Sequence, residues 1–404
     1  MKKIITLAAL IFAAVSCGSI NDLKDIKEIQ KVTTNVNVVT SSISAEIPRP
    51  DSYTVKFINY DEKLEIVKTT DASGKVSTSD IVPGVYTITV QGESAKGGFT
   101  YYFSGSETNT SIVSDNKSYN IELTASKAGA LILKEIYFNG STGYYFKDQF
   151  YEIYNNSNEV QYADGLCIAT LMPATATTTT YQWEVGEGKN PDDYIYCGSV
   201  WQIPVEGNGK NYPVAPGESI IIAQIAQNHT VIKSTSPVDL SKAEFETFIN
   251  TQTVNPDNPE SVNMTLKIDF NVFGTQWLVT VFGGAYVLFM PEADFDNATW
   301  VQPKGNATKA KEIPIDWVTD GVELVNNATK VTQKRMPSSL DAGATYTGAA
   351  YTGKSVSRKI KSTMPDGRIV YMDTNNSSED FQVNSKAVVR RNNAGAPSWS
   401  PASK

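Results

Sequence analysis

Hydrophobic and polar residues alternate along much of the chain, which is the pattern of β-strands that bury one face. Between residues 131 and 170, Ile132, Lys134 and Ile136 alternate, and residues 150–154 alternate again after a polar loop. Residues 155–158 (NNSN) form a turn sequence, because Asn and Ser side chains bond readily to nearby backbone. A further short strand starts at Leu166. This stretch therefore predicts two strands, a loop and a third strand of a β-domain.

The same alternation predicts a smaller β-domain over residues 31–125. Six or seven short apolar runs recur there, separated by turn sequences such as residues 71–74 (DASG) and the pair Pro83-Gly84. Short strands at this spacing are typical of a β-sandwich. The segment 55–90 also resembles the transthyretin-like (prealbumin-like) family. The matching residues are Asp71, Gly74, Pro83, Gly84 and Tyr86. The resemblance implies a spacer or stability module.

Residues 127–395 form the second predicted domain. Its opening stretch resembles the lamin-tail domain, an immunoglobulin-like β-sandwich. The matching residues are Ile132, Glu135, Ile136, Phe138, Asn139, Gly140, Tyr151, Glu152, Ile153, Tyr154, Asn155, Asn156 and Ser157. Residues 212–223 resemble a later strand of that family, and residues 355–381 resemble its closing segment. The resemblance implies that Arg358 pairs with Asp373 or Asp380.

The predicted fold is therefore all-β, with an N-terminal transthyretin-like β-sandwich followed by a larger lamin-tail-like β-sandwich that carries long insertions. The combination also resembles a Gram-negative lipoprotein family of unknown function. A sandwich of this kind needs about 100 residues. The surplus residues lie in three insertions, 172–211, 233–275 and 291–350. Long insertions in a compact domain are commonly either functional or disordered. The final residues, 396–404, form a tail.

The first insertion contains an aromatic cluster. Its members are Tyr181, Trp183, Tyr194, Tyr196 and Trp201. Aromatic side chains on loops at one end of a sandwich offer stacking surface for sugars, peptides or flat cofactors. The alternative is that they form a small satellite core that covers the sandwich.

The second insertion predicts a short helix near residue 241. Ser241 with Glu244 forms a capping box, and Leu240 with Phe245 forms a hydrophobic staple.

The N-terminal residues resemble a bacterial lipoprotein signal. Lys2-Lys3 precedes an apolar run over residues 4–14 that is too short to span a bilayer, and Cys17 follows small residues. We expect residues 1–16 to be a signal peptide, Cys17 to carry the lipid and residues 17–30 to be a tether. The alternative is an ordinary secretory signal. Since no Asp follows Cys17, we expect an outer-membrane location, facing either the periplasm or the surface.

Cys167 and Cys197 are the two remaining cysteines. Outside the cytoplasm such a pair predicts a disulfide. The alternative is two buried free thiols.

The composition of the chain restricts its possible partners, metal sites and reactions. The formal net charge is -8, which argues against nucleic acid as a partner, because neutralising phosphates requires a basic face. His229 is the single histidine and is expected in a surface loop. No metal site, cofactor or catalytic residue is predicted. The alternatives are an acidic trio for glycoside hydrolysis (Glu187, Asp192, Asp193) and two calcium sites (Glu292, Asp294 and Asp296; Asp373, Asn375 and Ser377).

These observations predict a non-enzymatic, lipid-anchored cell-envelope protein that binds a glycan or peptide ligand. An outer-membrane barrel transporter is the expected partner by analogy. The alternatives are a structural or adhesive surface protein, or an enzyme related to carbohydrates or nucleases.

Overall fold

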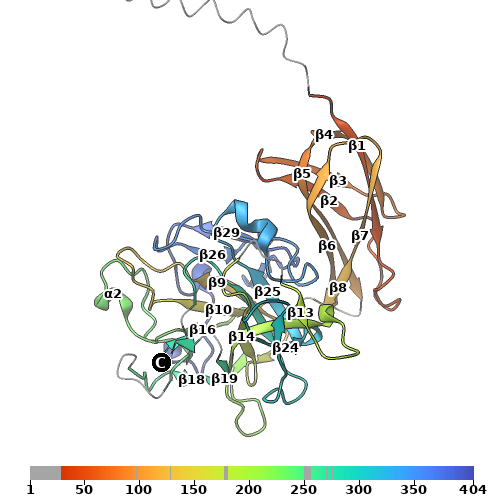
Figure 1. The fold of residues 1–404 in the computed structure, drawn as a ribbon. Helices are drawn as coiled ribbons and strands as arrows, with labels where there is room; N and C mark the ends of the chain where they lie inside the picture. Colours follow the sequence, from red (N-terminus) through yellow and green to blue (C-terminus); the bar gives the residue numbers. More distant parts are fainter. Residues whose placement is uncertain are drawn as a thin grey trace, which may run out of the picture.

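The computed structural model describes residues 29–96, 99–127, 129–176, 181–249, 256–269, 272–273, 276–277 and 279–404. The predicted signal peptide, Cys17 and the tether up to residue 28 lie outside the described residues. Strands dominate the described chain and are arranged in several sheets (Figure 1). The prediction of an all-β fold is confirmed.

The N-terminal part is a sandwich of two sheets. One sheet has the order β4 (Lys75–Ile81), β1 (Val32–Val39) and β7 (Lys117–Glu122). The other has the order β3 (Leu64–Thr69), β2 (Thr54–Asn59), β5 (Gly84–Lys96), β6 (Phe99–Ile112) and β8 (Thr124–Lys127). Alternate residues of both sheets, among them Val36, Phe57 and Ile88, are fully buried between them. The polar residues between them face outward, as the two-residue period requires.

The turn between β3 and β4 shows why its residue types are needed. The Asp71 side chain accepts hydrogen bonds from the backbone N–H groups of Ser73 and Lys75, each at 2.9 Å. Gly74 follows with φ +75°, and a Cβ there would lie 3.2 Å from Cβ of Val38. Asp therefore fixes the turn, and Gly supplies the left-handed backbone and the close approach.

The C-terminal part is a larger sandwich. Its seven-stranded sheet has the order β18 (Val262–Asn263), β17 (Phe245–Glu246), β16 (Ser219–Ala223), β10 (Phe150–Asn155), β9 (Leu131–Tyr137), β26 (Ser355–Arg358) and β29 (Phe381–Asn384). The facing sheet runs β13 (Trp183–Glu184), β23 (Trp300–Pro303), β24 (Ala310–Pro314), β14 (Tyr194–Gln202), β12 (Cys167–Leu171), β22 (Ala285–Phe289) and β25 (Val318–Glu323). In addition, β19 (Thr265–Asp269) pairs with β14. Side chains of both sheets, such as Ile153, Ile168 and Leu288, share one core.

The remaining strands and helices are short and lie outside these two large sheets. Three two-stranded sheets pair β11 (Gln161–Tyr162) with β15 (Pro213–Val214), β20 (Val272–Phe273) with β21 (Gln276–Trp277), and β27 (Ile360–Thr363) with β28 (Ile369–Tyr371). The helices of the described chain are α2 (His229–Ile232), α3 (Ser377–Asp380) and the 3₁₀ turns η2 (Pro191–Asp193), η3 (Ile315–Trp317), η4 (Ala328–Gln333), η5 (Arg391–Asn393) and η6 (Pro401–Ser403). In that part of the chain, none of the helices has the length and apolar character needed to cross a bilayer.

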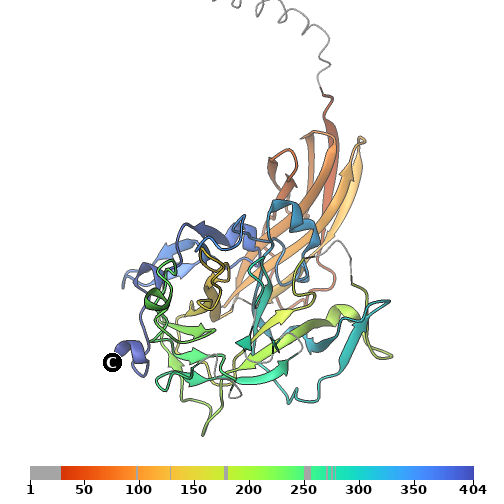
Figure 2. The ribbon, with the colours of Figure 1, turned by 60° about the vertical axis from the view of Figure 1, so that its left-hand side comes forward.

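The two sandwiches touch through polar side chains. Figures 1 and 2 show the N-terminal sandwich, coloured red to orange, standing at one end of the larger one. Lys56 Nζ lies 2.6 Å from a carboxylate oxygen of Glu379, and Gln91 donates a hydrogen bond of 3.4 Å to Thr374. Ser106 donates one of 2.8 Å to Ser338. The closing segment of the C-terminal sandwich therefore supports the N-terminal one.

The predicted helix near residue 241 is wrong. Phe245 is instead a strand residue, paired in parallel with Ile222 and Val262. The Glu244 carboxylate accepts a hydrogen bond of 2.7 Å from the N–H of Ile221 and forms an ion pair with Arg390. Tertiary contacts with β16 and the C-terminal segment therefore outweigh the local capping signal.

The predicted disulfide is also wrong, because Cys167 and Cys197 are separate buried thiols. They lie on neighbouring strands β12 and β14, but Cys197 is opposite Leu171, four positions beyond Cys167. At about 3.3 Å per residue this offset corresponds to roughly 13 Å, which is too far for a disulfide. Burial raises the pKa of both thiols.

Candidate functional site

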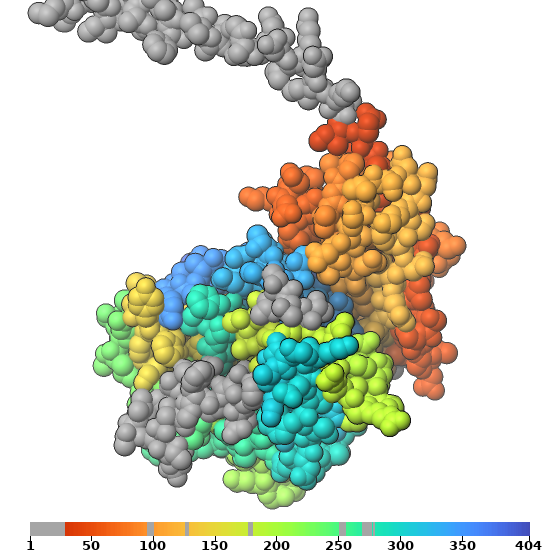
Figure 3. All heavy atoms as spheres, in the orientation of Figure 1, coloured from red at the N-terminus to blue at the C-terminus, as the bar shows by residue number. Residues whose placement is uncertain are grey.

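A pocket of about 210 Å³ opens beside the start of β14. Four of the five aromatic residues predicted as a cluster line it: Tyr181, Trp183, Tyr194 and Tyr196. We call it the aromatic pocket. Leu171, Met336 and Pro337 supply apolar wall on the other sides. Figure 3 shows the segment around residues 181–200, in yellow-green, lying beside the cyan segment around residue 300, which carries β23 and β24.

The strands position these rings. Tyr194 and Tyr196 are two residues apart on β14 and are half-buried, whereas Ile195 and Cys197 between and after them are buried in the core. This alternation is what a strand imposes. Trp183 lies on the edge strand β13, opposite Pro303 of β23. Its ring stacks on Tyr196, with centroids 4.4 Å apart and planes at 9°.

The other ring contacts complete the wall. Tyr181 meets Trp183 edge to face at 5.7 Å between centroids. The Tyr196 hydroxyl donates a hydrogen bond of 2.8 Å to the carbonyl of Pro191, and burial raises the pKa of Tyr196. Such stacked and edge-to-face rings are rigid and flat, which suits a ligand with a flat apolar face.

Trp201 does not belong to this site. It is fully buried in the sandwich core, opposite Ile168 of β12, with its ring centroid 6.2 Å from that of Trp277. Its assignment to the ligand-binding cluster is corrected. Trp201 is the second-to-last residue of β14, where the seven-stranded sheet covers it, whereas Tyr194 and Tyr196 lie at the start of the strand. Trp201 is thus part of the main sandwich core rather than of a satellite core, and ligand binding by the other four aromatic residues stays a prediction.

Charges at the pocket are balanced by protein partners. The Arg335 side chain, 2% exposed, lies 2.7 Å from the Glu323 carboxylate and donates a further hydrogen bond of 2.6 Å to the Leu324 carbonyl. Lys189 forms an ion pair with Glu312 and lies 5.0 Å above the Tyr194 ring. The hydrogen bond to Glu312 raises the pKa of Lys189. The two basic side chains near the pocket are therefore paired, and the exposed Asp192 carboxylate is the charged group that it presents beside the aromatic surface.

The three candidate carboxylates are all exposed: Glu187, Asp192 and Asp193. The last two belong to η2, which Asn190 caps by accepting a hydrogen bond from the N–H of Asp192 at 3.3 Å. Asn190 also donates one of 3.3 Å to Asp193. These acids thus build a turn, and only Asp192 lines the pocket.

His229 is buried, so its predicted surface position is wrong. Its Nδ1 lies 2.7 Å from the hydroxyl of Tyr145, and its Nε2 lies 2.9 Å from the carbonyl of Ile225. Burial lowers the pKa of His229. The neutral ring thus fastens α2 to the loop that contains Tyr145.

Arg358 is the centre of a buried charge cluster. Its guanidinium lies 2.7 Å from Asp320, 3.1 Å from Asp373 and 3.3 Å from Asp380. The expected pairing with Asp373 or Asp380 is confirmed for both. Sequence reasoning missed Asp320, because β25 lies far from the closing segment in the chain and carries no distinguishing motif.

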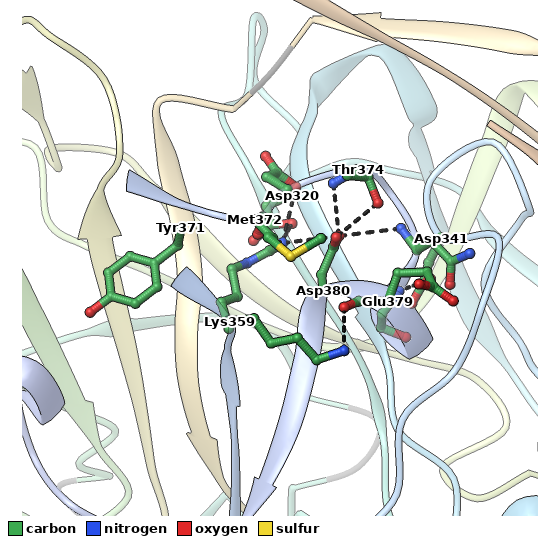
Figure 4. A network of polar contacts seen from close by, with 12 residues as sticks. Asp320, Asp341, Lys359, Tyr371, Met372, Thr374, Glu379 and Asp380 are labelled. Atoms are coloured by element: carbon green, nitrogen blue, oxygen red, sulfur yellow. Dashed lines mark hydrogen bonds and ion pairs between the residues drawn. The ribbon is translucent and has the colours of Figure 1, made fainter. Parts of the chain in front are cut away.

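Further bonds tie the closing segment to this cluster. Figure 4 shows Thr374 and Asp380 facing each other, and the Thr374 N–H and hydroxyl each donate a hydrogen bond of 2.8 Å to the Asp380 carboxylate. Lys359 donates one of 2.6 Å to the Glu379 carbonyl. Burial raises the pKa of Asp320 to about 7 and that of Asp380 to about 6. Because its side chains are buried and paired with one another, the cluster is a structural anchor.

Neither calcium alternative has the required geometry in the described chain. Asp296 forms an ion pair with Lys267, and Asp373 is occupied by Arg358. Over the same residues, no group of three or more His, Cys, Asp or Glu side chains is arranged to hold a metal ion.

Comparison with known proteins places the chain in a family. A family model described as "Protein of unknown function (DUF4876)" matches residues 215–388. A crystal structure of a DUF4876 family protein from Bacteroides thetaiotaomicron VPI-5482, at 2.50 Å resolution, is 37% identical in sequence, with a TM-score of 0.62. The match covers 92% of this chain and 100% of that one. No curated protein matches. The chain belongs to the DUF4876 family.

Proposed function

We propose that this protein is a non-enzymatic, lipid-anchored binding protein of the cell envelope that holds a glycan in the aromatic pocket. The observation that carries the proposal is the stacked pair of Trp183 and Tyr196 beside a pocket of about 210 Å³. Rings held on strands present a fixed apolar surface, and the loops at such a strand end are free to vary. The C–H groups on one face of a sugar ring match that surface.

The rim supplies polar partners for sugar hydroxyls. The Asp192 carboxylate lines the pocket and is exposed, and the Tyr181 hydroxyl lies 3.4 Å from that of Thr308. A few polar groups around apolar surface are what orient a ligand in a binding site. A short peptide is the competing ligand, and the experiment below separates the two.

The non-enzymatic part of the proposal rests on how the candidate catalytic groups are used. Both ring nitrogens of His229 are engaged by Tyr145 and Ile225, away from the pocket. Asp192 and Asp193 form the capped turn η2. Neither arrangement supports the paired carboxylates or the accessible base that hydrolysis needs.

The cell-envelope part of the proposal rests on the N-terminal sequence. A lipid on Cys17 would attach the chain to the outer membrane, and each buried CH₂ of such a lipid contributes about 0.8 kcal/mol. Palmitate labelling of the full chain should be lost in Cys17→Ala, and labelling that persists contradicts the anchor.

The partner part of the proposal is a barrel transporter, by analogy with other envelope lipoproteins that serve uptake. A pull-down from detergent-solubilised outer membrane should yield the transporter in stoichiometric amount. If no barrel co-purifies while the chain binds host matrix, the adhesive alternative replaces uptake.

Calorimetric titration of the full chain with neutral oligosaccharides and with tripeptides tests the ligand. We expect saturable binding of an oligosaccharide that falls at least tenfold in Trp183→Ala. Trp300→Ala is the matched control, because Trp300 is 43% exposed and lies outside the pocket lining. Binding of peptides alone would replace the glycan by a peptide, and equal loss in both variants would remove the pocket from the proposal.

A further inference from the structure

A second pocket, of about 270 Å³, lies elsewhere on the C-terminal sandwich. It is bounded by the turn that contains Gly217, the tip of the β27–β28 hairpin and the segment 392–394. We call it the Arg368 pocket. It shares no lining residue with the aromatic pocket.

Two buried tyrosines line this pocket at its base. The rings of Tyr154 and Tyr371 meet edge to face, with centroids 4.9 Å apart and planes at 89°. Figure 4 shows the Tyr371 ring pointing away from Asp380 and the other residues of the Arg358 cluster. The ring lines the Arg368 pocket instead. The Tyr154 hydroxyl donates a hydrogen bond of 2.6 Å to the Ile369 carbonyl.

Behind the rings lies a buried cation. Lys134 Nζ is 5.7 Å from the centroid of Tyr154 and 5.5 Å from that of Tyr371. It donates hydrogen bonds of 2.7 Å to Glu152 and 2.6 Å to the Arg391 carbonyl. Glu152 neutralises this charge, so the lysine fixes the base of the pocket without supplying a net charge to a ligand.

One wall of the pocket has a strained backbone. Arg390, Asn392 and Asn393 have φ of 53°, 61° and 57°, which is the left-handed region. Each such residue costs on the order of 1 kcal/mol or more, and the conformation persists only where the surroundings impose it. Here Arg390 forms an ion pair with Glu244, and Arg391 Nε lies 2.8 Å from Glu135. The strain brings two exposed Asn amides to the pocket.

Arg368 lines the same pocket from the hairpin tip, beside Asp366, whose carboxylate accepts a hydrogen bond of 2.9 Å from the Arg368 N–H. Its Nη1 donates a hydrogen bond of 3.3 Å to the Ser157 carbonyl, and its Nη2 donates one to the Asn158 side chain. A guanidinium has five N–H donors, so three have no acceptor among the described residues. Gly217 has φ +86° and leaves room for this side chain, since a Cβ there would lie 3.0 Å from Cγ of Arg368.

We propose that the Arg368 pocket binds a hexuronic acid, either free or as one unit of an acidic glycan. The remaining guanidinium donors match a carboxylate, which Arg binds in a fork geometry. The Asn393 amide and the remaining hydrogen-bonding capacity of the Asn392 amide, which donates a bond of 3.3 Å to the Tyr371 hydroxyl, match sugar hydroxyls. The volume lies below the roughly 300–1,000 Å³ of sites for drug-sized ligands and suits a single sugar ring. This site is additional to the aromatic pocket.

Titration of the full chain with glucuronate and galacturonate, against glucose and galactose, tests the proposal. We expect saturable binding of at least one uronate and at least tenfold weaker binding of its neutral counterpart. Arg368→Gln keeps most of the side-chain stem and should weaken uronate binding at least tenfold, whereas Trp183→Ala should leave it unchanged. Lys304→Gln is the control for a lost surface cation, since Lys304 is exposed and outside the pocket.

A second variant covers the case in which Arg368→Gln fails to fold. Asn392→Gly accepts the left-handed backbone and removes the amide together with its hydrogen bond of 3.3 Å to the Tyr371 hydroxyl, and it should weaken uronate binding several-fold. The proposal is overturned if neither uronate binds, if neutral sugars bind equally well, or if folded Arg368→Gln binds like the wild type. Loss of uronate binding in Trp183→Ala would assign it to the aromatic pocket instead.

Discussion

The charged groups around Arg358 and the aromatic side chains around Trp183 lie in the same sandwich but have opposite relations to solvent. Arg358 and its three Asp partners are buried, and each group is bonded within the protein. The Trp183 and Tyr196 rings are half-buried, stack on each other and still border a pocket. A buried, internally paired cluster suits a role in holding the fold, whereas partly exposed rings suit the ligand that we propose. The comparison separates stability from recognition, and the variants below test that separation.

Arg358→Ala should produce the largest effect. It leaves three buried carboxylates without their cation, and breaking a buried pair in this way costs about 3–5 kcal/mol. Urea denaturation of the full chain measures the loss of unfolding free energy. A loss below about 1 kcal/mol would show that water reaches the cluster, which would remove the contrast with the aromatic pocket.

Trp201→Ala should cost a similar amount. Trp201 is fully buried, and truncation of such a side chain costs about 3–5 kcal/mol because it leaves a cavity. The same denaturation experiment applies. If this variant were as stable as Trp183→Ala, the division of the aromatic cluster into core and pocket would be wrong.

The pH dependence of stability should follow the Arg358 cluster. The folded-state pKa values of Asp320, about 7, and Asp380, about 6, lie above their ordinary value of 3.8. The folded state therefore binds more protons than the unfolded state between pH 4 and 7, so the contribution of these groups to stability falls as pH rises through that range. Denaturation at pH 4.5 and 7.5 gives the unfolding free energy of the wild type and of Asp320→Asn at each pH. The difference between the two proteins isolates the contribution of Asp320 to the pH dependence. The decline should be shallower in the variant, and identical slopes would contradict it.

Trp183→Ala should change stability by less than about 1 kcal/mol, because the side chain lies on an edge strand and is only half-buried. Denaturation beside Trp201→Ala gives the direct contrast. A cost above about 3 kcal/mol would make the aromatic cluster a satellite core rather than a binding surface.

The smallest expected effect is on the chemical labelling of the two buried thiols. Cys167 and Cys197 are buried, and burial raises their pKa, so a thiol reagent should label neither in the folded chain and both after unfolding under non-reducing conditions. Failure to label the unfolded chain would indicate that the two cysteines form a disulfide after all.

Local patterns predicted the strands because alternation and turn chemistry are encoded within a few residues. The resemblance to the lamin-tail closing segment also carried the Arg358 pairing correctly. Long-range partners were not predictable in the same way. Glu244 has a capping spacing in the sequence, yet Ile221 and Arg390 bind it in the fold. Likewise Trp201 differs from Tyr196 only in how far along β14 it lies, which depends on where the facing sheet ends.

Calorimetric titration of Trp183→Ala and Trp300→Ala with the oligosaccharide that binds the wild type most tightly tests the central claim most directly. The account predicts at least tenfold weaker binding in Trp183→Ala, unchanged binding in Trp300→Ala, and unfolding free energies within about 1 kcal/mol of wild type for both. Wild-type affinity in a folded Trp183→Ala variant would contradict it.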